Sequence, residues 1–280
     1  MLCLGSMTTA NTLDRVFNGY SLIAINVIII VLALTVGGGL YFFETGLIHL
    51  IAILFIALAI LRSFYHHYTY DPILEKFVHA SLFALLVFAG SHIIEYVSMM
   101  FLNRYVDAVF ANVANFYLIS TFAIIIGATY FSSINHKTYS SLLRGFSYAI
   151  IAVLLLFSLF LFANDRAISL DTQSGASYVY TFMLIVTGVL AAIEIVRIRR
   201  LTPIMSGFTK YLLAALIAIL VAILPNIFYE VLGDAGIPSY ASIYVSHFLF
   251  YAALSLFFLA FKKMSYLGGV YEDLKALDVH

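Results

Sequence analysis

The stretch AVFANVANFYLISTFAIIIGATYFSSINH, residues 108–136, contains no Asp, Glu, Lys or Arg. An α-helix rises ~1.5 Å per residue and the hydrocarbon layer of a bilayer is ~30 Å thick, so this stretch is long enough to cross a membrane once. Further charge-free windows lie on both sides of it, at 16–43, 45–61, 77–94, 145–164, 172–193, 211–229 and 235–261. The sequence therefore predicts an all-α, polytopic integral membrane bundle with eight transmembrane helices.

The composition of the whole chain favours this fold class and excludes others. Hydrophobic residues make up 64% of the chain and charged residues 10%, and the mean hydropathy is +1.05. A water-soluble domain needs more polar residues than this to cover its surface. No loop carries a basic run long enough to follow the phosphates of a nucleic acid. We therefore expect the lipid bilayer, and no nucleic acid, as a partner.

Charged residues, glycines and prolines at the edges of the windows set the expected helix ends. The predicted transmembrane helices span about 16–36, 44–63, 78–100, 108–132, 146–163, 178–197, 210–232 and 240–261, in a single domain of residues 1–280 with a short cytoplasmic tail at 264–280. Gly37-Gly38-Gly39 suits a tight turn, and a re-entrant first pair of helices stays an alternative to two crossings. Met1 and Met7 are both candidate starts.

The positive charges are distributed unevenly between the two predicted faces. If every window crosses once, only Arg104 and Arg166 lie on one face. The other face carries twelve of the fourteen Lys and Arg residues: Arg15, Arg62, Lys76, Lys137, Arg144, Arg197, Arg199, Arg200, Lys210, Lys262, Lys263 and Lys275. Short loops rich in Lys and Arg stay in the cytoplasm. This predicts an N-in/C-in protein of the cytoplasmic (plasma) membrane.

Most polar residues at membrane depth then fall in the outer half of the bundle. An ionisable side chain inside a membrane is a functional hypothesis by default. His92 and Glu95 have i, i+3 spacing, so they share one helix face. The sequence predicts an outward-facing polar pocket, with interhelical hydrogen bonding as the alternative. Its candidate ligand-binding residues are His49, His92, Glu95, Asn112, Asn115, Asn226, Glu230 and His247. In the inner half, Glu194 is expected to pair with Arg197.

A metal site depends on whether three of these histidines meet. His49, His92 and His247, with Glu95, would supply a three-His, one-carboxylate ligand set suited to zinc or iron. Spacing along the chain cannot show convergence between helices, so no cofactor is predicted and a divalent metal stays open. The sequence contains no H-E-x-x-H, G-x-S-x-G or P-loop motif, so an enzyme is the less favoured interpretation.

The C-terminal segment resembles a known type of linker. Residues Tyr271–His280 include Leu274 and Leu277, three apart, as at the start of an amphipathic helix. This is similar to the linker that follows the multi-helix membrane input region of prokaryotic sensor histidine kinases. The eight crossings, the minimal loops and the polar outer cluster resemble such a region as well. The phosphoacceptor-histidine motif and the ATP-binding domain are absent, so the resemblance implies a sensor module without kinase activity.

Three functions are compatible with these features. The favoured one is a membrane receptor or sensor module that binds a small polar ligand, a proton or a cation and couples to a cytoplasmic tail, with a homodimer or a cytoplasmic signalling protein as partner. A small transporter or channel is the alternative, although it should have more polar residues in its inner half. A metal-assisted membrane enzyme acting on a lipid or a quinone is the third.

Overall fold

The computed structural model describes residues 15–36, 45–64, 72–98, 100, 107–133, 137–163, 175–201, 206–227, 236 and 239–277. These ranges contain eight helices and no strand, which confirms the all-α prediction. In chain order the helices are α2 (Gly19–Thr35), α4 (Leu47–Phe64), α5 (Pro72–Val97), α6 (Asp107–Ser132), α7 (Lys137–Ala163), α8 (Gly175–Leu201), α9 (Ser206–Ile227) and α11 (Ser239–Leu277).

Five of these helices are long and apolar enough to cross a membrane. The candidate spans are Glu75–Val97, Asn112–Tyr130, Lys137–Leu161, Thr181–Arg200 and Ile243–Met264. Three shorter apolar helices accompany them, at Gly19–Thr35, Leu47–Ser63 and Ser206–Ala222. The helices expose many large apolar side chains, as a lipid-facing surface requires. The chain thus has the character of a membrane protein.

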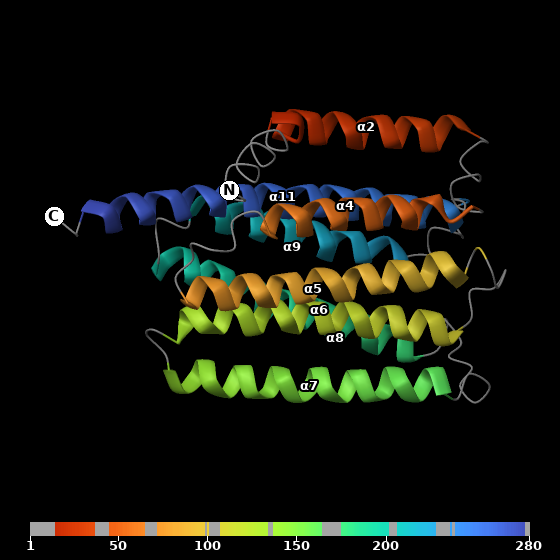
Figure 1. Cartoon of the computed structure of the whole chain (residues 1–280). Coiled ribbons are helices and arrows are strands. Elements are labelled where there is room, and N and C mark those ends of the chain that lie inside the picture. Colours follow the sequence, from red (N-terminus) through yellow and green to blue (C-terminus); the bar gives the residue numbers. More distant parts are fainter. Residues whose placement is uncertain are drawn as a thin grey trace.

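Six helices pack into a closed ring, in the order α4, α5, α6, α8, α9 and α11, with α11 again contacting α4. α7 lies outside the ring against α6, and α2 lies outside it against α11, at opposite edges of the bundle in Figure 1. Successive helices alternate in direction (Figure 1). One end of the bundle therefore collects the starts of α4, α6 and α11 and the end of α5, and the other end collects the helix ends that carry Lys and Arg.

The helices differ from the expected spans mainly at the basic end. α5 begins at Pro72, α7 begins at Lys137 and α11 continues without a break to Leu277. The expected spans stopped near charged residues, whereas a helical backbone can continue past the hydrocarbon layer while Lys and Arg side chains reach toward water. Proline is also tolerated at a first helical position. The tail expected at 264–280 is therefore helical as far as Leu277, as a direct continuation of α11.

Close helix packing generates a stability prediction at Gly188 of α8. A methyl group there would lie 2.3 Å from Leu220 Cδ2 and 3.0 Å from Leu220 Cγ on α9, so Leu220 would have to leave its present position between the two helices. We expect Gly188→Ala to lower the thermal unfolding midpoint in detergent, matching an overpacking cost of about 1–3 kcal/mol.

Gly145→Ala is the matched control, because a methyl group at Gly145 of α7 meets nothing within 4 Å. This substitution should leave the midpoint unchanged or raise it, since alanine favours a helix over glycine by about 1 kcal/mol. Equal midpoints for the two variants would contradict the close approach of α8 and α9.

Candidate metal centre

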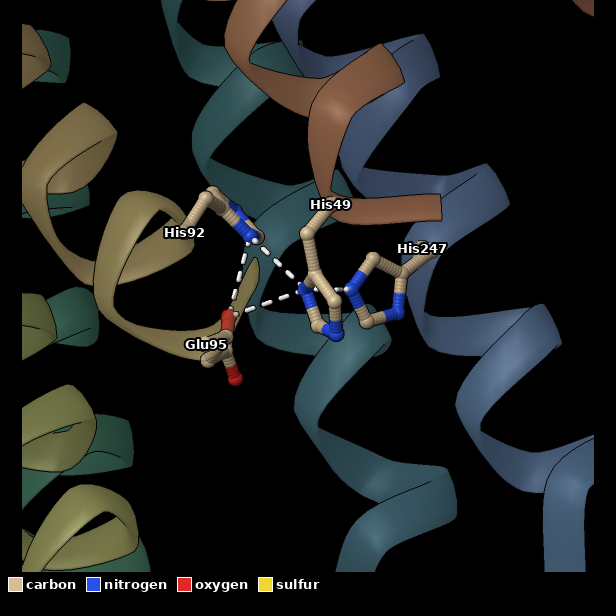
Figure 2. Close-up of side chains that lie close together, drawn as sticks. All are labelled: His49, His92, Glu95 and His247. Atoms are coloured by element: carbon tan, nitrogen blue, oxygen red, sulfur yellow. Dashed lines mark hydrogen bonds and ion pairs between the residues drawn. The ribbon is translucent and has the colours of Figure 1, made fainter. Parts of the chain in front are cut away.

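Three helices bring His49, His92, Glu95 and His247 together near one end of the bundle, and these four residues are named the His/Glu cluster below. His49 comes from the start of α4, His92 and Glu95 from the last turns of α5, and His247 from the first turns of α11 (Figure 2). One ligand atom from each residue lies within 4.8 Å of every other. All four are buried, with exposed fractions of 2%, 0%, 4% and 5%.

The contacts inside the cluster centre on the Nδ1 atom of His49. It lies 3.1 Å from Glu95 Oε2, 3.1 Å from His247 Nε2 and 3.5 Å from His92 Nδ1. Glu95 Oε2 is also 3.1 Å from His92 Nδ1. A ring nitrogen carries either one proton or one lone pair, so it cannot form good hydrogen bonds to three neighbours at once. The converging donor atoms instead match the requirement of a single cation between them.

A second contact fixes the ring of His247. Its Nδ1 lies 2.9 Å from the backbone carbonyl of Ile243, one turn earlier in α11. Donation of the Nδ1 proton to that carbonyl leaves a lone pair on Nε2, the atom that faces the cluster. Histidines that bind metals commonly make such an outer hydrogen bond. His247 is therefore oriented and in the tautomer that a metal ligand needs.

The chain brings α4 close to its neighbours through two local features. Gly46, with φ of +64°, precedes α4, and its carbonyl accepts a hydrogen bond from the His49 backbone N–H at 3.0 Å. A side chain at Gly46 would lie 3.1 Å from the ring of Tyr96, the residue after Glu95. Tyr251 of α11 donates its hydroxyl proton to the carbonyl of Ile48 at 2.5 Å. These contacts hold His49 against α5 and α11.

Aromatic side chains close the cluster on the side toward the middle of the bundle. The rings of Phe88, Phe250 and Tyr117 have centroids 5.0, 6.0 and 6.3 Å from that of His92. They also contact one another, at centroid separations of 4.9 to 5.7 Å. Phe88 is one turn before His92 in α5, and Phe250 follows His247 in α11, so both lie deeper than the ligands. Sequence patterns missed this aromatic layer, because its members look like ordinary core residues.

The remaining predicted site residues are distributed differently. Asn112 is buried on α6, the helix that packs against α5. Asn115 instead donates to Ser158 Oγ of α7 at 3.1 Å, on the outer side of α6. The side chain of Asn226 and the whole of Glu230 lie outside the described residues. The structure thus brings together the four proposed metal ligands and directs Asn115 elsewhere.

Glu194 lies at the opposite, basic end of the bundle and makes the ion pair expected for it. Arg197 Nη1 is 2.5 Å from Glu194 Oε1, Ser132 of α6 donates to Oε2 at 2.6 Å, and Tyr139 of α7 donates to Oε1 at 3.3 Å. Both oxygens of this buried carboxylate therefore have partners. The arrangement joins α6, α7 and α8 and accounts for Glu194 as a structural residue.

A substitution at Tyr251 tests whether its hydrogen bond to Ile48 holds α11 against α4. Tyr251→Phe removes the donor to the Ile48 carbonyl and keeps the ring, which stacks on Phe55 at 5.5 Å. We expect a loss of about 1 kcal/mol, seen as a lower thermal unfolding midpoint. Tyr20→Phe, at a position that is 88% exposed, is the control and should have no effect. An unchanged midpoint for Tyr251→Phe would show that this contact does not hold α4 to α11.

No family model matches the sequence, and the searches of curated proteins and of solved structures found no match either. The geometry and chemistry of the His/Glu cluster are therefore the basis for a functional proposal.

Proposed function

We propose that this chain is a multi-pass membrane protein that binds a divalent transition-metal ion, zinc in the first place, and acts as a receptor or sensor module for it. The observation that carries the proposal is the buried convergence of four ligand atoms within 4.8 Å. Three imidazoles and one carboxylate suit zinc and ferrous iron. They do not suit copper(I), which prefers sulfur ligands, or magnesium and calcium, which prefer oxygen.

The separations between the ligand atoms support a tetrahedral ion. Zinc bonds of ~2.0–2.1 Å at tetrahedral angles place ligand atoms about 3.3 Å apart. Four of the six separations in the cluster are 3.1, 3.1, 3.1 and 3.5 Å, and the other two are at most 4.8 Å. Small rotations of the side chains would complete the coordination shell. The apolar surroundings would then strengthen binding, because the ion neutralises a carboxylate that burial would otherwise destabilise.

α11 supports coupling of the ion to the opposite face. It contributes His247 to the cluster and continues to Leu277, a distance of roughly 45 Å at ~1.5 Å per residue. In the N-in/C-in arrangement of eight crossings, the cluster faces outward and the end of α11 lies in the cytoplasm. If α11 has two conformations and the ion binds one of them more tightly, ion binding increases the population of that conformation. The end of α11, like the linker of a sensor kinase input region, would present that shift to a second copy or a cytoplasmic protein.

Two features favour a receptor over the other functions. The aromatic layer beside His92 closes the cluster toward the middle of the bundle, and both carboxylate oxygens of Glu194 have partners, which favours a binding site over a permeation path. A metal-assisted enzyme needs an open coordination position, whereas four protein ligands complete a tetrahedral zinc shell. We therefore favour the receptor over the transporter and over the enzyme.

Metal binding is the first test. The purified full-length protein should bind about one zinc ion per chain, measured by elemental analysis after gel filtration and by chelator competition. His49→Ala, His92→Ala, His247→Ala and Glu95→Gln should each weaken binding by at least about 100-fold, since each removes a ligand from the ion itself.

His79→Ala is the matched control, because His79 is exposed on the same helix as His92 and Glu95. It should bind zinc as the unchanged protein does. Circular dichroism of each variant distinguishes a lost ligand from a lost fold. A folded protein that binds no ion, or variants that all bind equally, would contradict the proposal.

The receptor assignment has its own test at the end of α11. A spin label at Lys275→Cys, in a Cys3→Ser background, should change mobility when zinc is added to protein in lipid vesicles. The same label combined with His247→Ala should not respond, because that variant lacks the ligand on α11. Zinc uptake into the vesicles with no change at the label would instead favour the transporter.

A further inference from the structure

We infer that Lys76 and Arg144 form a headgroup site for an anionic phospholipid, at the end of the bundle opposite the His/Glu cluster. The two cations come from different helices, α5 and α7, and both lie over the ring of Tyr130 on α6. Lys76 Nζ is 5.0 Å and Arg144 Cζ 4.3 Å from the ring centroid. The Tyr148 hydroxyl lies 3.5 Å from that of Tyr130, so a second hydroxyl group is present beside the ring.

The depth of this group fits a lipid phosphate. Lys76 is the second residue of one candidate span and Tyr130 is the last residue of another. The ends of membrane spans lie at the level of the headgroups, where tyrosine and basic side chains are favoured. Arg144 is the eighth residue of the span Lys137–Leu161, and its guanidinium lies over the ring of Tyr130, so the charged group is beside a residue at the end of a span.

The charges of Lys76 and Arg144 are not balanced by the protein. Neither side chain forms an ion pair with a carboxylate in the part of the chain that the structure describes. Glu75 is adjacent to Lys76, but neighbouring residues on a helix do not face each other. The contacts with Tyr130 stabilise each cation only modestly and do not neutralise its charge. A phosphodiester supplies the missing negative charge and can accept two parallel hydrogen bonds from the arginine.

An apolar stripe continues from Arg144 along the same face of α7. It consists of Tyr148, Leu155 and Leu159, at positions i+4, i+11 and i+15, with exposed fractions of 51%, 40% and 66%. The acyl chain of a lipid whose phosphate lies at Arg144 can pack along this stripe. Two cations next to exposed apolar side chains of α7 favour a phospholipid, because a free phosphate would contact the cations and leave the apolar side chains exposed.

Native mass spectrometry of the full-length protein in detergent tests this site. Phosphatidylglycerol should bind and stay bound, while phosphatidylcholine at the same concentration should bind much more weakly. The double variant Lys76→Gln with Arg144→Gln should lower the affinity for phosphatidylglycerol about thirtyfold, because it removes both cations that contact the bound phosphate, at about a fivefold factor each.

Arg199→Gln with Arg200→Gln is the matched control, since it removes two exposed basic residues from the same end of the bundle. It should change the affinity less than about threefold. A charge-conserving pair, Lys76→Arg with Arg144→Lys, should keep most of the binding and show that the site tolerates substitution. Equal losses in the two charge-removing pairs, equal binding of the two lipids, or equally tight binding of inorganic phosphate would each overturn the inference.

Discussion

The shared contact of His49 Nδ1 with Glu95 Oε2 and His247 Nε2 determines how three helices meet. A buried carboxylate in an apolar bundle is strongly unfavourable unless positive charge or several hydrogen-bond donors surround it. The imidazoles of His49 (α4) and His92 (α5) contact Glu95, and the imidazole of His247 (α11) contacts His49. In our proposal, a cation between these four residues supplies the positive charge that the buried carboxylate requires. The positive φ of Gly46 and the hydrogen bond from Tyr251 to Ile48 support this contact, because both let α4 approach its neighbours closely.

Each end of the bundle contains a buried carboxylate, and the two carboxylates obtain their polar partners differently. At the basic end, Glu194 is satisfied within the protein by Arg197, Ser132 and Tyr139, so that end is a closed structural network. At the other end, Nδ1 of His49 faces three polar atoms of the His/Glu cluster. One ring nitrogen can donate or accept only one good hydrogen bond, so hydrogen bonding alone does not account for these contacts. A buried carboxylate whose partners are all present is explained by the fold alone, whereas converging ring nitrogens favour our proposal of a binding site. This contrast is why we assign function to one cluster and structure to the other.

The sequence predicted the helical membrane fold and the pairing of His92 with Glu95, because both depend on composition and on spacing within one helix. It also predicted the partner of Glu194, which is three residues away on α8. Convergence of His49 and His247 on that pair depends on packing between helices, which periodicity does not encode. Asn115 is a second case in which the sequence does not show which neighbouring helix a side chain faces. We expected it in the pocket, but its side chain donates a hydrogen bond to Ser158 on α7. The aromatic layer around His92 was not predicted, because Phe88 and Phe250 carry no signal beyond hydrophobicity.

X-ray absorption spectroscopy of the zinc-loaded protein tests the central claim most directly, because it reports the ligands of the ion without a crystal. The account predicts four nitrogen or oxygen ligands at ~2.0–2.1 Å, with scattering from three imidazole rings and none from sulfur. The His247→Ala protein, loaded at higher zinc, should show one imidazole fewer. A shell of mostly water ligands, or an imidazole count that does not change in this variant, would contradict coordination by His49, His92, Glu95 and His247.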